Sequence, residues 1–277
     1  LQKVAETHPV WPPVEALRVS QDRLLEKQLF SQLKIPTPPF RTVDSLEDLH
    51  AAVKALGLPC VLKTRRLGYD GKGQRYLRKP GDLEPAWNAI GNVPLILEGF
   101  VHFEREVSIV GVRSTTGEVR AYPIVANTHK DGILRVTLAP HRHPDLQKAA
   151  EICLKRVLRH FEYAGVLTLE FFVARGRLVA NEMAPRVHNS GHWTIEGAVT
   201  SQFENHLRAI LGLPLGDTSP SGHCAMINFI GTLPERDAIL ALPGVHWHDY
   251  GKELRPGRKI GHCTVVAASA VATAAPT

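Results

Sequence analysis

The sequence is poor in cysteine and has no long hydrophobic run, and each absence argues against a class of protein. Its 277 residues contain only four cysteines, which are far apart and form no Cys-x-x-Cys pair: Cys60, Cys153, Cys224 and Cys263. This pattern gives neither a zinc site nor a disulfide framework and suits a reducing compartment. No stretch reaches the roughly 20 apolar residues that a membrane-spanning helix needs, and no signal peptide opens the sequence. We therefore expect a cytoplasmic protein that does not enter a membrane.

Aromatic residues are also scarce, at 6%, although the net charge of +6 and the pI near 9.2 invite a nucleic-acid-binding interpretation. Basic residues are scattered along the chain and form small clusters only at 63–66 and 255–259. No run of aromatic residues lies between these clusters to stack on bases. Small anions such as phosphates explain the clusters better than a polyanion does, so we expect no nucleic-acid partner.

What the sequence does contain is an alternation of helical and strand patterns. Ser20 is expected to cap a helix, and Ser45 with Asp48 resembles a capping box for another that Gly57 ends. The expected helices cover 20–34, 45–57, 82–90, 145–163 and 200–212. The expected strands are 59–63, 76–77, 95–98, 105–113, 120–125, 133–138 and 223–230, with hairpins at 166–182 and 246–266. The predicted class is α+β, with mostly antiparallel sheets that helices cover on one face, and residues 1–19 are expected to be a connector.

Two glutamates flank the turn of the expected hairpin at 166–182. If residues 175–177 form a three-residue loop, Glu170 lies directly opposite Glu182. Two carboxylates about 5 Å apart repel by roughly 3 kcal/mol at an effective dielectric near 20, whereas a cross-strand pair contributes at most about 1 kcal/mol. A shared divalent cation would remove the repulsion, and Mg²⁺ is typically held by one or two carboxylates together with nucleotide phosphates. The alternative is an acidic sheet edge exposed to water.

A glycine-rich loop, Gly-Tyr-Asp-Gly-Lys-Gly-Gln at 68–74, lies between two expected strands. Its glycines allow backbone N–H groups to approach phosphates, but because no helix follows, it is neither a Walker loop nor a dinucleotide fingerprint. It fits a flap over a triphosphate, with a plain hairpin loop as the alternative. Lys63 ends the strand that leads into it. Of Glu98 and Glu106, one could bind ribose hydroxyls, and ordinary surface charge is the alternative for both.

Together with Glu-Gly-Phe-Val at 98–101, these residues resemble, in their order, the nucleotide site of the ATP-grasp family. Two motifs are more specific: Pro-Arg-Val-His-Asn-Ser-Gly-His-Trp-Thr at 185–194 and Arg-Pro-Gly-Arg-Lys-Ile-Gly-His at 255–262. Over residues 1–266 the sequence is similar to the N5-carboxyaminoimidazole ribonucleotide synthetases, ATP- and bicarbonate-dependent enzymes of purine synthesis. The resemblance implies an ATP-grasp fold, in which two α+β subdomains sandwich the nucleotide, and usually a homodimer.

The resemblance also implies how the chain is divided. The N-terminal domain of the family is absent from this sequence, and the C-terminal domain stops early. The implied parts are a linker at 1–19, an ATP-grasp domain at 20–215 and an incomplete β-rich C-terminal domain at 216–277. Within the ATP-grasp domain, the first lobe is expected at 20–97, with its flap at 68–74, and the second at 98–215.

Individual roles follow from the same resemblance. Arg23 and Lys63 are implied to contact the ATP phosphates, which are covered by Gly68, Tyr69, Asp70, Gly71, Lys72, Gly73 and Gln74. The adenine is implied to contact the backbone of Glu98, Gly99, Phe100 and Val101. Glu106 is implied to bind the ribose, and His129 and Asn181 to line the nucleotide site. Glu170 and Glu182 are implied as Mg²⁺ ligands. Around bicarbonate and 5-aminoimidazole ribonucleotide the implied residues are Tyr69, Asp70, Arg186, His188, Asn189, Lys252 and Arg258.

The implied reaction is carboxylation of the amino group of 5-aminoimidazole ribonucleotide, through carboxyphosphate formed from ATP and bicarbonate. Such phosphoryl transfer needs positioning and positive charge, and Asp70 is the expected proton acceptor for the amine. Lys252 and Arg258 would clamp the 5′-phosphate. Two alternatives stay open. One is another ATP-grasp carboxylase or ligase acting on a different amine, such as a formate-using glycinamide ribonucleotide transformylase. The other is a non-catalytic fragment that binds MgATP.

Two histidines in the motif at 185–194 could suggest a further metal site. His188 and His192 flank Ser190 and Gly191, but histidine suits Mg²⁺ poorly and no cysteine is near, so we expect hydrogen bonds to an anion instead. Ser190 lacks the Gly-x-Ser-x-Gly context of a hydrolase nucleophile.

Overall fold

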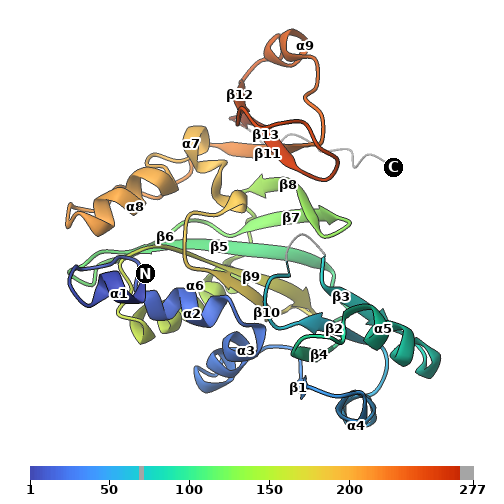
Figure 1. The fold of residues 1–277 in the computed structure, drawn as a ribbon. Helices are drawn as coiled ribbons and strands as arrows, with labels where there is room; N and C mark the ends of the chain where they lie inside the picture. The colour runs from blue at the N-terminus through green and yellow to red at the C-terminus, as the bar shows by residue number, and fades with distance from the viewer. Residues whose placement is uncertain (69–71, 269–277) are drawn as a thin grey trace.

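The computed structural model describes residues 1–68 and 72–268, which form two antiparallel sheets with helices packed on them (Figure 1). The smaller sheet has the strand order β1-β4-β2-β3. Its strands are β1 (Phe40–Val43), β2 (Cys60–Thr64), β3 (Gln74–Leu77) and β4 (Leu95–Gly99). The accompanying helices are α4 (Leu46–Leu56), the short η1 (Pro80–Asp82) and α5 (Leu83–Ile90), and their apolar side chains share one core with the sheet. None of the helices in the described ranges is long and apolar enough to cross a membrane.

The ends of α4 follow the expected capping pattern. The Ser45 hydroxyl accepts a hydrogen bond from Asp48 N at 3.0 Å, and the helix ends at Gly57, whose φ of 79° is one that glycine adopts without strain. The smaller lobe is therefore built much as its local sequence signals indicate.

The larger sheet has the strand order β10-β9-β5-β7-β8-β11-β13-β12, with β6 paired to β5 beside it. Its strands are β5 (Arg105–Arg113), β6 (Val119–Ala121), β7 (Val125–Lys130), β8 (Ile133–Ala139), β9 (Gly165–Ala174), β10 (Arg177–Ala184), β11 (His223–Ile230), β12 (Val245–Asp249) and β13 (Lys259–Ala267). The helices are α6 (Pro144–His160), η2 (Asn189–Gly191), α7 (Thr194–Gly197), α8 (Gln202–Ile210) and α9 (Arg236–Leu240).

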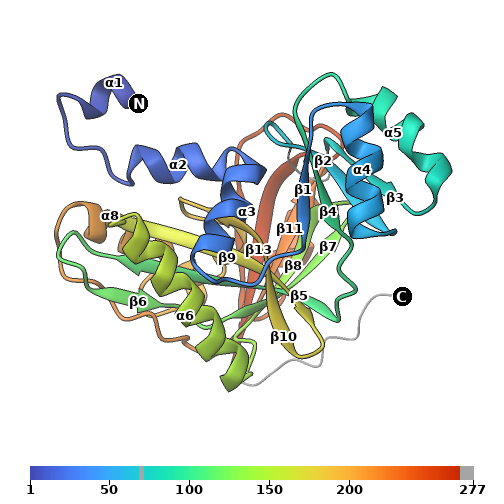
Figure 2. The ribbon, with the colours of Figure 1, turned by 90° about the horizontal axis from the view of Figure 1, so that it is seen from below.

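Helices cover both faces of the larger sheet, whereas one covered face was expected. Along β5, Val107 and Ile109 belong to a core shared with α6, and Val110 and Val112 belong to a second core on the side of α8. Figure 1 shows α6 and α8 on opposite sides of β5, and Figure 2 shows α6 lying across the sheet beside α3. The segment that indicates two covered faces is 107–112. A strand with one exposed face is buried at alternate positions, whereas every residue of this segment is buried.

The N-terminal residues form three helices where a connector and one helix were expected. These are α1 (Gln2–Ala5), α2 (Val14–Ser20) and α3 (Arg23–Gln32). Ser20, the expected cap, is instead the last residue of α2, and Asp22 caps α3 by accepting hydrogen bonds from the backbone N–H groups of Leu24 and Leu25. Ala16 and Val19 of α2 are buried in the core of the larger sheet.

The C-terminal strands β11, β13 and β12 extend the larger sheet beyond β8. β11 pairs with β8 on one side and with β13 on the other. The expected strand at 120–125 is divided into β6 and β7, which pair with different parts of β5. Pro123, which has no backbone N–H to donate to a ladder, lies between them. The division of the chain into three parts remains a prediction.

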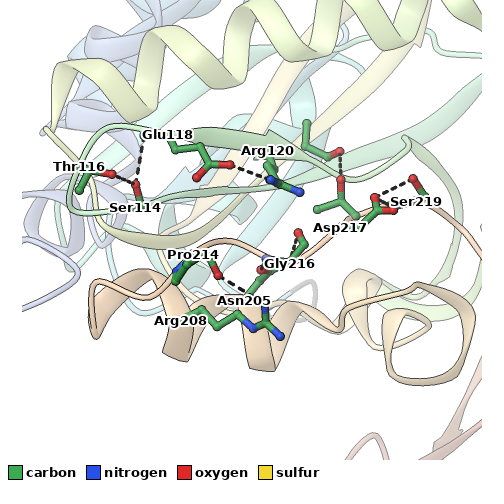
Figure 3. A network of polar contacts seen from close by, with 12 residues as sticks. Ser114, Thr116, Glu118, Arg120, Asn205, Arg208, Pro214, Gly216, Asp217 and Ser219 are labelled. Atoms are coloured by element: carbon green, nitrogen blue, oxygen red, sulfur yellow. Dashed lines mark hydrogen bonds and ion pairs between the residues drawn. The ribbon is translucent and has the colours of Figure 1, made fainter.

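Polar contacts fix the loop that follows α8 to the rest of the larger lobe (Figure 3). The buried Asn205 of α8 donates to Gly216 O and accepts from Gly216 N at 2.8 Å. In the same region Thr218 donates to Ala121 O of β6 at 2.9 Å. These contacts tie α8 and the loop after it to each other and that loop to β6.

Candidate active site

The hairpin of β9 and β10 places Glu170 directly opposite Glu182, as the sequence predicts. The expected three-residue loop is wrong, however. The turn has two residues, Arg175 and Gly176, with φ of 52° and 70°, which is the conformation that suits the twist of a tight hairpin. This turn sets a register in which Asn181 would face Glu170. A β-bulge at that residue shifts the ladder by one position and brings Glu182 opposite Glu170.

Helix α3 holds this bulge from the outer edge of β10. Lys27 Nζ donates to the carbonyl groups of Ala180 at 3.3 Å and Asn181 at 2.7 Å, and Glu26 Oε1 accepts the backbone N–H of Met183 at 2.6 Å. A bulge disrupts the hydrogen bonds of its ladder, and buried backbone groups need partners. Glu26 and Lys27 supply them while being only 2% and 1% exposed.

Sequence reasoning missed Glu26 and Lys27, although a signal was present. Both lie three or four residues before Phe30, which is fully buried, and residues at those spacings share a helix face. Charged residues on the apolar face of a helix require a specific partner. That requirement distinguishes them from ordinary solvated charges.

Glu98 occupies the opposite wall of the site and is neutralised by two lysines. Its Oε2 lies 3.0 Å from Lys63 Nζ and 3.6 Å from Lys27 Nζ, and the residue is 2% exposed, so the surface-charge interpretation of Glu98 is wrong. Burial alone would raise its pKa, but the two ammonium groups outweigh burial and hold the pKa at about 2. Burial also lowers the pKa of Lys27, while the three oxygen acceptors around Nζ match the three donors of its charged form.

At Glu170 the balance is reversed, because the charges of His129 and Lys259 do not outweigh burial and the neighbouring carboxylate. Burial, and then the carboxylate of Glu182, raise its pKa to about 8. Its Oε1 lies 3.1 Å from His188 Nε2, so His188 does meet an anion, which is a carboxylate of the protein itself. Burial and the charge of Arg186 lower the pKa of His188 to about 3, so the ring is neutral and does not offset the negative charge. The cost of ionising Glu170 beside Glu182 is therefore expressed as its raised pKa.

A second carboxylate and histidine lie next to this pair. Glu106 forms an ion pair with His129. Burial would lower the pKa of His129, but the carboxylates of Glu106, Glu170 and Glu182 overcome it and raise the pKa. The positive charge of His129 is thus directed to the edge of the acidic cluster.

The two lobes enclose a cavity of about 920 Å³, and most of the expected site residues line it. These are Arg23, Lys63, Gly68, Gln74, Glu98, Gly99, Phe100, Val101, Glu106, His129, Glu170, Asn181, Glu182, Arg186, His188 and Asn189. Tyr69, Asp70 and Gly71 lie outside the described residues. Lys72, Gly73, Lys252 and Arg258 are not among the lining residues, whereas Lys259, which sequence reasoning did not select, is.

The two basic residues expected at the 5′-phosphate make contacts elsewhere. Lys252 Nζ lies 4.9 Å from the centroid of the Tyr250 ring, and Arg258 Nη1 lies 3.4 Å from Glu253 O. Arg23 reaches the start of the glycine loop, where it donates to Thr64 O and Gly68 O. A Cβ at Gly68 would lie 2.6 Å from that guanidinium, so a side chain here would displace Arg23 from its present position.

The chemistry of the acidic pair fits Mg²⁺. In residues 1–68 and 72–268 no three His, Cys, Asp or Glu side chains converge as a metal site built from protein alone. Mg²⁺ needs fewer protein ligands, because it is usually held by one or two carboxylates with phosphates and water. Glu170 and Glu182 offer two hard oxygen donors whose repulsion a cation would relieve.

Comparison with known families agrees with the fold. The model of the ATP-grasp domain matches residues 28–203, and the model of the phosphoribosylaminoimidazole carboxylase C-terminal domain matches residues 224–275. The fold is thus that of an ATP-grasp protein, as the sequence predicts.

Similar proteins identify the particular family within the ATP-grasp proteins. The N5-carboxyaminoimidazole ribonucleotide synthase of Pseudomonas aeruginosa is 56% identical over 93% of this chain and 71% of its own length. The crystal structure of the synthetase from Thermus thermophilus superposes with a TM-score of 0.92 at 53% identity, covering 96% of this chain and 73% of that one. The Aspergillus clavatus synthase, solved with ADP and 5-aminoimidazole ribonucleotide, has a TM-score of 0.89 at 29% identity, with 96% and 74% covered. The chain belongs to the N5-carboxyaminoimidazole ribonucleotide synthase family.

Proposed function

We propose that this chain catalyses the ATP- and bicarbonate-dependent carboxylation of the amino group of 5-aminoimidazole ribonucleotide, giving N5-carboxyaminoimidazole ribonucleotide, ADP and phosphate. The observation that carries the proposal is the pair Glu170 and Glu182, which face each other in the cavity between the two lobes of a chain of this family. A bicarbonate oxygen attacks the γ-phosphorus of ATP, and ADP leaves. The amine then attacks the carboxyl carbon of carboxyphosphate, loses a proton, and phosphate leaves.

Glu170 and Glu182 are the residues that would hold Mg²⁺. When bound, the ion neutralises charge on the phosphates during transfer. The two carboxylates are fixed for this task by their ladder positions rather than by flexible loops. Their mutual repulsion in the ligand-free protein favours occupancy by a divalent cation.

Positive charge on the rest of the cavity wall serves the anionic reactants. Lys63 lines the cavity from the smaller lobe and Arg23 from α3. Arg186 and Lys259 line it from the larger lobe. Fixed cations aimed at a transferring phosphoryl group stabilise its transition state without reorganisation. Both amide atoms of Asn189 are buried without a partner among the described residues, which suits hydrogen bonding to a bound substrate.

The remaining roles extend the proposal to residues at the cavity and around it. We assign the adenine contact to the backbone of 98–101, the ribose to Glu106, and the cover over the phosphates to 68–74, with Asp70 as proton acceptor. The positive φ of Gly73, 72°, suits the tight turn that such a cover needs. We also propose that the protein acts in the cytoplasm as a homodimer.

The test is ADP release by the purified chain in the presence of Mg²⁺ and ATP. We expect 5-aminoimidazole ribonucleotide with bicarbonate to stimulate release, and glycinamide ribonucleotide with formate to leave it at the background rate. Stimulation by the second pair alone would assign the chain to a different ligase. Binding of MgADP without stimulation by either pair would leave only a nucleotide-binding role.

A further inference from the structure

A chain of buried hydrogen bonds ends at Glu170. It begins on β8 with Thr137, passes through Asn127 on β7 and Ser108 on β5, and reaches Ser190 in η2 and then His188. The donor–acceptor distances are 2.9, 2.9, 2.7 and 2.8 Å. The exposed fraction is at most 8% for every member, so water does not compete for these groups.

The direction of the chain is set where it meets the imidazole. The backbone N–H of Ser190 donates to His188 Nδ1 at 3.2 Å, and a backbone amide can only donate. His188 Nδ1 is therefore an acceptor, and in a neutral ring the proton must then lie on Nε2. The Ser190 hydroxyl adds a second donor to the same nitrogen, because its own oxygen accepts from Ser108.

The main chain of His188 is held as firmly as its ring. Gln202 Oε1 accepts the His188 N–H at 2.9 Å, and Gln202 Nε2 donates to His188 O at 2.7 Å. Gln202 is fully buried, and a Cβ at Gly191 would lie 2.5 Å from its Oε1. Rotation of the ring away from Glu170 would break its contacts with Glu170 Oε1 and with the N–H and hydroxyl groups of Ser190, while Gln202 keeps the main chain in place.

We propose that Ser190, supported by Ser108, holds His188 as the Nε2–H tautomer, so that the ring donates to Glu170 Oε1 and positions that carboxylate beside Glu182. His188 is then a positioning residue for Glu170. A neutral donor orients Glu170 without cancelling its charge, whereas a charged ring would compete with a cation. Partners of this kind typically change metal affinity by about 10- to 100-fold when they are removed.

The tautomer is measured first, in the protein without nucleotide or Mg²⁺. Long-range ¹H–¹⁵N spectra of ¹⁵N-histidine-labelled protein report on the ring nitrogens. The signals of His188 are those that disappear in H188N and remain in the exposed control H50N. We expect Nδ1 at the shift of an unprotonated ring nitrogen and Nε2 at that of a protonated one. The opposite pattern, or two protonated nitrogens, would overturn the proposal.

The positioning role is tested by ADP affinity with Mg²⁺ and with EDTA. The amide nitrogen of Gln can reach the position of Nε2, whereas that of Asn cannot. We therefore expect H188N to reduce the Mg²⁺ enhancement of ADP affinity about tenfold, with H188Q within about threefold of the unchanged protein. Equal losses in both variants, or losses that are the same with EDTA, would reduce His188 to a structural role.

The role toward Mg²⁺ rests on the proposed function, but the tautomer does not. If 5-aminoimidazole ribonucleotide fails to stimulate turnover while the tautomer and the H188N effect are found, the proposed function is wrong and this inference stands. If turnover is found and His188 has the other tautomer, the proposed function stands and this inference is wrong.

Discussion

Glu98 and Glu170 are both largely buried carboxylates on the walls of one cavity, yet their surroundings are opposite. Glu98 lies between the ammonium groups of Lys63 and Lys27, and its pKa is about 2. Glu170 faces another carboxylate and a neutral histidine, and its pKa is raised to about 8. The first site is neutralised by the protein. At the second, Glu170 keeps its proton up to about pH 8, so a bound cation would favour the ionised pair by displacing that proton.

Lys27 connects the two sites, because it contacts Glu98 on one side and the bulge that positions Glu182 on the other. We expect K27M to have the largest effect on stability. It leaves the Asn181 carbonyl and part of the charge of Glu98 without a partner, and the Ala180 carbonyl with only its hydrogen bond from Thr37, which should cost about 4 kcal/mol. Urea unfolding measures this, with the exposed K54M as control. A loss below about 1 kcal/mol would show that the bulge does not depend on α3.

Removing each carboxyl charge should sharpen the contrast. E98Q leaves the buried Lys27 and the partly exposed Lys63 without their anion and should destabilise the protein by about 3 kcal/mol. E170Q removes a repulsion and should be neutral or stabilising by about 1 kcal/mol in EDTA at pH 8. Both values come from urea unfolding of the ligand-free protein. Similar destabilisation by the two variants would contradict the difference between the sites.

The two sites should also respond to pH in opposite directions. Between the ordinary Glu pKa of about 4.5 and the raised value of about 8, Glu170 ionises only in the unfolded chain, so its contribution to stability falls as the pH rises. E170Q should therefore gain on the unchanged protein between pH 5 and pH 8. For Glu98 the unfolded chain takes up the proton first, so its contribution falls as the pH drops from 4.5 toward 2. Unfolding free energies at pH 3.5, 5 and 8 test both directions, and parallel profiles would refute the comparison.

The sequence predicts much of the fold because its signals are local. Ser45 and Gly57 bound α4 as expected, and the residues 131 and 132 form the expected turn between β7 and β8. The motifs that carry the family resemblance are also contiguous, so they are visible without the structure. The opposition of Glu170 and Glu182 follows from hairpin geometry, although the loop length behind that prediction is wrong.

What could not be predicted depends on contacts between distant parts of the chain. The bulge at Asn181 is held by Lys27, which is 154 residues away in sequence, and no pattern within 166–182 predicts it. The tautomer of His188 likewise depends on Ser108, which is brought to Ser190 by the pairing of distant strands. Local periodicity carries no information on such contacts.

The most direct test of the account is the affinity of ADP for the protein and for E182Q, measured by calorimetry with Mg²⁺ and with EDTA. We predict that Mg²⁺ tightens ADP binding at least about tenfold, or about 1.4 kcal/mol, in the unchanged protein and in the exposed control E84Q. In E182Q this enhancement should disappear while the affinity in EDTA is kept. An undiminished Mg²⁺ enhancement in E182Q would contradict the claim that the facing carboxylates form the cation site.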